Sequence, residues 1–258
     1  MAVDIRAAAA KYYDANPYIP DDIPFYKALI PAPETYVLEL GCGTGRVLLP
    51  LAEPCGYIHG IDASEAMLSV CRMKLHSAGI PSSRARVEVG DITNFDLGRT
   101  FPMIIAPFRV FQNLGADAEV DGLFRCVRQH LSPGGTCILN AFNPYRDAET
   151  LRREWCTDAE MFCWEVAAEG GRVSCHERRP RMDAEKLILY PELIYRRYQR
   201  EALTEEAVLQ IAMRCYYPDA FEELIVGHGF QVIKRWGGYA GELYGGGPEL
   251  VIQFSDRA

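Results

Sequence analysis

The order of apolar and polar positions changes twice along the chain. In the first half, short apolar runs that end near glycine or aspartate alternate with stretches of helical period. Such runs are typical of strands buried on both faces of a parallel sheet. We expect strands over residues 36–40, 57–61, 86–89, 103–106 and 136–141, and helices over residues 46–52, 64–78 and 118–130. This alternation predicts a parallel sheet with helices on both faces.

A second pattern covers residues 161–217, where longer runs alternate between apolar and polar positions. We expect strands over residues 172–178, 186–197 and 208–216, with a turn at Asp183–Glu185 between the first two. The alternation predicts an antiparallel sheet inserted into the α/β fold.

The first pattern then returns. A helix is expected over residues 219–227, and strands over residues 230–236 and 249–254 bring the mostly parallel sheet to seven strands. At the other end of the chain, residues 4–15 and about 21–29 predict two helices separated by a Pro-rich turn. The expected parts are an N-terminal helical cap over residues 1–33, an α/β domain over residues 34–146 and 217–258, and an inserted antiparallel sheet over residues 147–216.

Composition narrows the class of protein. Of the 258 residues, 49% are hydrophobic and 24% charged, so a sizeable core can form. The formal net charge of −8, with no run of Lys or Arg, argues against nucleic acid and anionic membranes as partners. No apolar stretch is long enough to span a membrane, and we interpret the N-terminus as lacking a signal peptide.

The cysteines and histidines argue against disulfide bonds and against a metal site. The nine cysteines are an odd number, scattered without any CxxC pair, which indicates reduced thiols packed as small core residues. The five histidines are far apart in sequence, so we expect no metal site. Together these features predict a cytoplasmic protein.

The most informative stretch follows the first expected strand. Gly41, Gly43 and Gly45 occupy alternate positions between that strand and a helix, where they allow a sharp turn and a close approach to a ligand. The second strand ends at Asp62, about twenty residues later, where a carboxylate can accept hydrogen bonds from a ribose. The combination predicts a ligand that contains a nucleoside. The GxGxG spacing differs from the GxGxxG of dinucleotide sites, which disfavours a nicotinamide-dependent oxidoreductase.

Residues 39–45 (ELGCGTG) closely resemble the first motif of class I S-adenosylmethionine-dependent methyltransferases. Later motifs of that family have counterparts in the same order: GIDASEAML at 60–68, VGDI at 89–92, FPMIIA at 101–106 and LSPGG at 131–135. Pro102 stands where the family usually has an acidic residue, at the start of a strand, where a missing N–H is tolerated. The resemblance covers roughly residues 35–142 and 217–255, and it implies a Rossmann-like sheet with S-adenosyl-L-methionine as cofactor.

The resemblance also implies a set of cofactor-binding residues. The acidic residue after the second strand would hold the adenosine ribose, and the third motif would contact the adenine. The predicted set is Tyr12, Gly41, Cys42, Gly43, Gly45, Asp62, Ala63, Met67, Asp91, Ile92, Pro107 and Phe108. The inserted sheet and the N-terminal helix would cover the site where the acceptor binds.

Catalytic residues are less clearly indicated. The candidates are Tyr13 in the N-terminal helix, Arg109 after the fourth strand, His176 in the insert and Tyr217 at its end. In the loop over residues 107–113, Phe108 and Phe111 are candidates for the wall of the methionine end or for the core, and Gln112 for a polar contact. We interpret Asn143-Pro144-Tyr145 as a turn, because it lacks the second proline of the motif found in amine methyltransferases that act on DNA bases.

The sequence therefore predicts a methyltransferase that acts on a small molecule by in-line displacement. Its helix, inserted sheet and Tyr-Tyr-Pro segment loosely resemble sugar and glycine-type N-methyltransferases. A non-catalytic S-adenosylmethionine-binding protein and a protein or RNA methyltransferase are the alternatives. A homodimer is compatible with the sequence, and the acceptor, its reacting atom (N, O, S or C) and any general base stay open.

Overall fold

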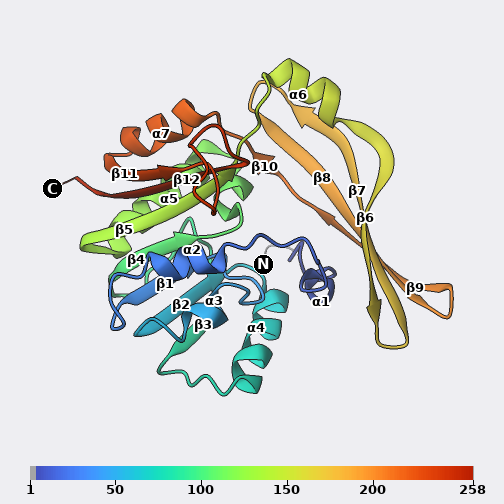
Figure 1. Ribbon diagram of the computed structural model, residues 1–258, viewed down its shortest axis with the longest axis horizontal. Helices are drawn as coiled ribbons and strands as arrows, with labels where there is room; N and C mark the ends of the chain where they lie inside the picture. Colours follow the sequence, from blue (N-terminus) through green and yellow to red (C-terminus); the bar gives the residue numbers. More distant parts are fainter. Residues whose placement is uncertain (1–3, 258) are drawn as a thin grey trace.

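The computed structural model describes residues 4–257; residues 1–3 of the predicted cap and residue 258 lie outside them. Two sheets dominate the fold, with the chain running from the α/β part into the second sheet and back (Figure 1). Within residues 4–257, no helix combines the length and the apolar composition needed to span a bilayer. The nine cysteines are free, and seven of them are buried.

The larger sheet has seven strands in the order β11-β12-β5-β4-β1-β2-β3. Its parallel strands are β1 (Tyr36–Leu40), β2 (Tyr57–Asp62), β3 (Ala85–Val89), β4 (Phe101–Ala106) and β5 (Leu131–Phe142). β12 (Glu249–Asp256) pairs antiparallel with both β5 and β11 (Phe230–Trp236). The predicted Rossmann-like sheet of seven mostly parallel strands is confirmed.

Helices cover both faces of this sheet, as predicted. The helices that pack on it are α2 (Ile23–Ala28), α3 (Leu48–Leu51), α4 (Glu65–Ser77), α5 (Asp117–His130), α7 (Pro218–Gly227) and a 3-10 turn η1 (Val110–Asn113). One apolar cluster joins Leu123 of α5 and Phe221 of α7 to Leu38 of β1, and another joins Leu48 and Leu68 to the other face. Ser64 caps α4, because its hydroxyl accepts a hydrogen bond from the N–H of Met67.

The inserted segment forms the predicted antiparallel sheet. It contains α6 (Ala148–Trp155), β6 (Thr157–Ala168), β7 (Gly171–Asp183), β8 (Ile188–Gln199), β9 (Ala202–Gln210) and β10 (Met213–Arg214). The single strand predicted over residues 208–216 is wrong. β9 ends at Gln210, which pairs with β8. The chain then separates from β8 and pairs with it again as the short strand β10, in which Met213 lies opposite Leu189 near the start of β8.

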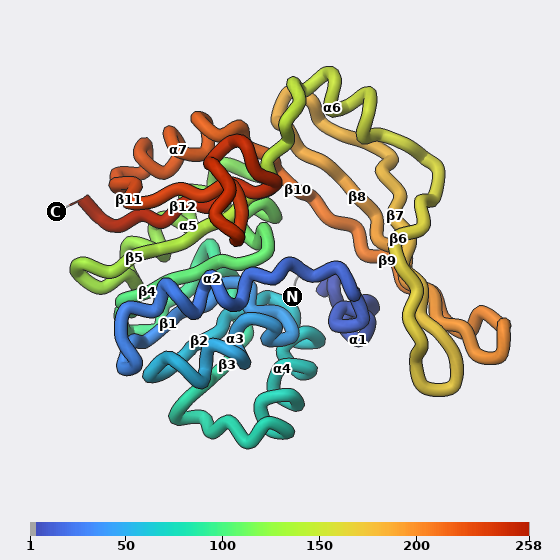
Figure 2. Tube along the Cα trace, viewed as in Figure 1, coloured from blue at the N-terminus to red at the C-terminus, as the bar shows by residue number. Residues whose placement is uncertain are grey.

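The N-terminal segment is less helical than predicted. Residues 4–15 contain only the short helix α1 (Ala10–Tyr13), preceded by turns. Asp4 explains this difference: its carboxylate accepts hydrogen bonds from the N–H of Arg6 and from the hydroxyl of Ser64, which fixes the chain in a turn at the start of α4. The segment passes between the two sheets (Figure 2), and Ala9 and Tyr12 pack against the inserted sheet.

Candidate functional site

The loop after β1 makes a tight turn at its glycines. Gly41 and Gly45 have φ angles of 67° and 82°, in the left-handed region that disfavours other residues. A Cβ at Gly41 would lie 2.6 Å from the methyl groups of Val110, and one at Gly45 would lie 2.6 Å from the sulfur of Cys71. The glycines thus let the backbone pass close to both the post-β4 loop and α4.

Asp62 lies at the carboxyl end of β2, beside this loop. One oxygen of its carboxylate accepts the N–H of Gly43 at 2.8 Å, and the other accepts the N–H of Ser64 at 2.8 Å. The side chain is 8% exposed. The structure therefore brings together Gly43 and Asp62, which the sequence analysis assigned to one ligand, although they are 19 residues apart.

A small cleft of about 40 Å³ opens beside the loop. Its lining comes from α1, the end of β1, the Gly-rich loop and the loop after β4. The lining residues are Tyr13, Glu39, Gly41, Cys42, Gly43, Thr44, Arg46, Val47, Pro107, Phe108 and Val110. Predicted cofactor residues thus share this cleft with the catalytic candidate Tyr13. Burial raises the pKa of the Tyr13 hydroxyl, so that it stays protonated near neutral pH and is suited to donate a hydrogen bond.

Several charged residues at the cleft were not singled out in the sequence analysis. Glu39 is 2% exposed and has a carboxylate oxygen without a partner. Arg46 forms two hydrogen bonds with the fully buried carboxylate of Asp22. An acidic residue inside a strand that is otherwise apolar is a signal that could have identified Glu39. The pairing of Arg46 with Asp22 has no such signal, because it depends on where the N-terminal segment lies.

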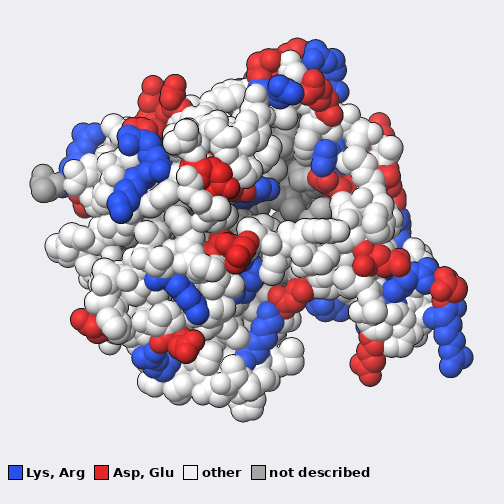
Figure 3. Space-filling view, in the orientation of Figure 1, with Lys and Arg blue, Asp and Glu red and all other residues white. Residues whose placement is uncertain are grey.

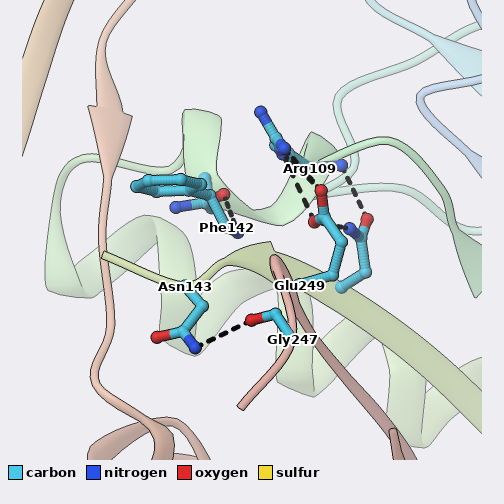
Figure 4. Close-up of polar contacts among 7 residues, drawn as sticks. Arg109, Phe142, Asn143, Gly247 and Glu249 are labelled. Carbon is cyan, nitrogen blue, oxygen red and sulfur yellow. Dashed lines mark hydrogen bonds and ion pairs between the residues drawn. The ribbon is translucent and has the colours of Figure 1, made fainter. Parts of the chain in front are cut away.

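The loop after β4 is conformationally strained and firmly held. Phe108 and Arg109 have φ angles of 54° and 64°, which are rare for residues other than glycine. The N–H of Arg109 donates to Asn140, and its guanidinium pairs with Glu249 at the start of β12. Figure 4 shows the Arg109 side chain directed at Glu249, with Phe142 nearby. The guanidinium of this catalytic candidate therefore already has a carboxylate partner.

Two further residues of this loop are fully buried and make contacts within the fold. Phe111 is fully buried against Phe124 and Phe221, which favours the core reading of this ring over the cleft reading. The amide of Gln112 is also fully buried: it donates to the carbonyl of Arg214 in β10 and accepts the N–H of Phe142. Gln112 thus joins the inserted sheet to the larger sheet.

His176 is a catalytic candidate that lies on the distant face of the inserted sheet. Tyr12 of α1 stacks on Tyr195 of β8, which pairs with Cys175 on β7. Because successive side chains of a strand point to opposite faces, His176, the residue after Cys175, points away from α1. Tyr12 itself, a predicted cofactor residue, packs in the apolar cluster of the insert.

Tyr217, another catalytic candidate, lies in a separate groove of about 660 Å³ that is open to solvent. The groove is formed where the chain enters and leaves the insert, and Asn143, Tyr145 and Arg146 also line it. The Tyr217 hydroxyl donates to the carbonyl of Arg146 at 2.9 Å. Asn143 donates to the carbonyl of Gly247 (Figure 4), consistent with a role in shaping the turn.

The remaining predicted cofactor residues do not line the cleft. Ala63 is exposed beside Asp62, and the Met67 side chain is buried. Asp91 follows β3 on the surface, and its carboxylate accepts the N–H and the hydroxyl of Thr93. Ile92 packs against the core. These positions stay predictions for the adenosine end of the cofactor.

Comparison with known proteins matches this part of the chain. Residues 37–135 match the family model described as a methyltransferase domain. A relative from Streptomyces fradiae, dTDP-3-amino-3,6-dideoxy-alpha-D-glucopyranose N,N-dimethyltransferase, is 29% identical over 103 residues, 40% of this chain and 38% of the relative. The solved structure of the CcbJ methyltransferase from Streptomyces caelestis superposes with a TM-score of 0.77 and 25% identity, covering 99% of both chains.

Residues 37–135 thus form a methyltransferase domain, which places this part of the chain among the class I S-adenosylmethionine-dependent methyltransferases. A second relative, dTDP-3-amino-3,4,6-trideoxy-alpha-D-glucopyranose N,N-dimethyltransferase from Streptomyces venezuelae, is 29% identical over 46% of each chain. The matched part of the chain thus spans less than half the length of these two curated relatives. S-adenosylmethionine is the cofactor of this methyltransferase domain, as the sequence predicted.

The residues present fit that cofactor. S-adenosylmethionine carries an ammonium group and a sulfonium, and the cleft offers the unpartnered oxygen of the buried Glu39. Asp62 is an acceptor at the position from which a ribose can be held, and Gly41 and Gly43 leave room for close approach of the ligand to the backbone. Glu39, Asp62 and the Gly-rich loop are therefore the residues that would hold it.

Proposed function

We propose that this chain transfers the methyl group of S-adenosylmethionine to an amine nitrogen of a small-molecule acceptor. The proposal is carried by the two neighbouring tyrosines of α1: Tyr13 lines the cofactor cleft, whereas Tyr12 packs on the inserted sheet. The inserted sheet is thereby held next to the cleft, and the surface is hollowed between the two parts of the molecule (Figure 3). Two relatives, each matched over less than half of this chain, are named for N,N-dimethylation of dTDP-linked amino sugars.

Methyl transfer requires the protein mainly to position the two reactants. When bound, S-adenosylmethionine would supply a methyl group on a positively charged sulfur: the lone pair of the acceptor would bond to the methyl carbon as the bond from that carbon to sulfur breaks, which leaves S-adenosylhomocysteine. The chain's part is to hold the two reactants in line and to exclude water, and such alignment can supply about 7–11 kcal/mol of the barrier. The strained Phe108 and the protonated Tyr13 lie where they can do this.

An amine acceptor also fits the side chains at the cleft. A hydroxyl acceptor needs a base that removes its proton, whereas an amine that arrives neutral attacks through its free lone pair. Among the residues that line the cleft in the described range 4–257 there is no histidine, and the one carboxylate, Glu39, is almost fully buried. This arrangement favours a nucleophile that does not depend on a strong base.

A turnover assay with a matched acceptor panel tests the proposal. The purified full chain is incubated with S-adenosylmethionine carrying a labelled methyl group, and with amino sugars, free and nucleotide-linked, beside the corresponding hydroxyl sugars. We expect S-adenosylhomocysteine and a methylated product to form only with the amines. Turnover with the hydroxyl sugars alone, or methylation of added RNA or protein without turnover of any small molecule, would overturn the assignment of the acceptor.

A binding experiment tests the assignment of the cofactor independently of the assignment of the acceptor. In calorimetric titrations with S-adenosylmethionine, the wild type should bind and Asp62→Ala should lose most of its affinity, roughly 30-fold or more if one charged hydrogen bond of about 2 kcal/mol is lost. Glu53→Gln, a change at an exposed carboxylate distant from the cleft, is the matched control. Binding without turnover across the whole panel would support a non-catalytic cofactor-binding protein instead.

A further inference from the structure

Among residues 4–257, three buried carboxylates and one largely buried guanidinium lie around the cofactor cleft. Asp22, Glu39 and Asp62 are 0%, 2% and 8% exposed, and Arg46 is the cation among them. If all four groups were ionised, the cluster would carry a net charge of −2 in a place that water barely reaches. Buried charge of one sign is costly unless it is paired, so that such a site favours protonation or a cationic ligand.

The hydrogen bonds show which carboxylate lacks compensation. The guanidinium of Arg46 forms its two hydrogen bonds with Asp22, and both oxygens of Asp62 accept backbone N–H groups. Glu39 has an oxygen with no partner, and it lines the cleft. The excess negative charge of the cluster is therefore concentrated at Glu39.

The groups that face Glu39 from neighbouring elements do not neutralise it. Burial raises the pKa of the hydroxyls of Tyr13 (α1) and Tyr26 (α2), and of the thiols of Cys42 in the loop and Cys71 on α4. These four groups thus stay neutral. Burial likewise raises the pKa of Glu39 well above its usual range; Arg46 opposes this shift, while Asp22 and Asp62 add to it.

We propose that Glu39 is protonated in the free protein and releases its proton to solvent when the cationic cofactor enters the cleft. The inference rests on the proposed cofactor site and adds a coupling between cofactor binding and the ionisation of one residue. The O–H bond of the carboxyl breaks, its electron pair stays on the carboxylate, and the proton passes to the buffer. The new carboxylate then balances the positive charge of the ligand, which replaces the missing partner.

Calorimetry in paired buffers measures this proton directly. S-adenosylmethionine is titrated into the full chain near neutral pH in phosphate and in Tris, whose ionisation enthalpies differ, so that the difference in observed heat gives the number of protons released. We expect the wild type to release close to one proton more than Glu39→Gln, which has the same shape and cannot ionise. The difference also cancels any proton exchange of the ligand's own amino group. Glu53→Gln should match the wild type.

Two further measurements keep the test decisive if Glu39→Gln fails to fold. In the wild type, the affinity for S-adenosylmethionine should rise by up to about tenfold per pH unit below the free-state pKa of Glu39, and level off above it. Methylthioadenosine, which lacks the amino acid and the positive charge, should bind without proton release. Binding of S-adenosylmethionine with no proton release and a flat pH profile would overturn the coupling and leave the cofactor site intact. Absence of binding in every buffer would overturn the proposed function itself.

Discussion

The backbone N–H of Gly43 donates to the Asp62 carboxylate at 2.8 Å, which ties the Gly-rich loop to the end of the neighbouring strand. The other oxygen of Asp62 accepts the N–H of Ser64 at the start of α4. One buried side chain therefore holds two backbone segments in place before any ligand arrives. Asp62 has a structural role in addition to its expected contact with the cofactor ribose.

This double role predicts a stability loss that does not depend on ligand. Asp62→Ala removes two hydrogen bonds from backbone N–H groups to a carboxylate, so that the free energy of unfolding should fall by about 2–4 kcal/mol. Urea unfolding of the cofactor-free protein measures this loss. Asp91→Ala, at an exposed turn, is the control and should cost under about 1 kcal/mol. An equal loss in the two variants would contradict the role assigned to Asp62.

A pair of glycine substitutions separates backbone strain from crowding. Gly45 and Gly79 both have φ in the left-handed region, at 82° and 66°. A Cβ at Gly79 meets open space, whereas one at Gly45 would lie 2.6 Å from the sulfur of Cys71. Gly79→Ala should therefore cost only the conformational strain, about 1 kcal/mol. Gly45→Ala adds overpacking and should cost about 2–5 kcal/mol in total. Thermal and urea unfolding of both variants check this, and equal losses would refute the crowding at Gly45.

The buried Glu39 predicts how the stability of the cofactor-free protein depends on pH. Burial raises its pKa in the folded state above the usual value of 4.5, so that the folded state binds its proton more tightly than the unfolded chain does. This contribution is fully present below about pH 4.5, is lost as the pH rises through the folded-state pKa, and is constant above it, with a slope of up to about 1.4 kcal/mol per pH unit. Unfolding free energies measured across this range should show the decline in the wild type. The same curve for Glu39→Gln should lack it, and parallel curves would show that other groups cause the decline.

Gln112 is expected to set the position of the inserted sheet. Gln112→Ala leaves the carbonyl of Arg214 and the N–H of Phe142 without their partners, and each buried group left unpaired costs about 1–3 kcal/mol. The lost contact joins the insert to the larger sheet, so that the KM for the acceptor should rise several-fold while the Kd of the cofactor changes by less than about two-fold. Gln210→Ala, at an exposed site on β9, is the control. A cofactor Kd that weakens as much as the acceptor KM would contradict a role confined to the insert.

The α/β part could be predicted closely because its signals are local. Runs such as 36–40 and 57–61 are apolar on both faces and end at Gly41 and Asp62, so that each boundary coincides with a change in chemistry. The helix α6 was not predicted, since of its eight residues only Leu151 is buried. Its start nevertheless carried a local signal, because the Asp147 carboxylate caps the N–H of Thr150.

The candidate site was predicted only where one short motif provides it. The loop and Asp62 lie within one strand-helix-strand unit, whereas the pairing of Arg46 with Asp22 and of Arg109 with Glu249 joins segments far apart in sequence. Single-sequence patterns contain no information about such pairs. In the insert, both faces of β7 carry charged side chains, so that the pattern could not tell whether His176 points toward α1 or away from it.

The insert leaves and rejoins the larger sheet at adjacent points, since the hydroxyl of Tyr217 reaches the carbonyl of Arg146. A segment whose two ends emerge side by side can be exchanged for another of different length without pulling the flanking strands apart. The α/β part that binds the cofactor could then stay unchanged while different inserted segments replace one another. Chimeras joined at these two positions offer a practical route to new acceptors on a single scaffold.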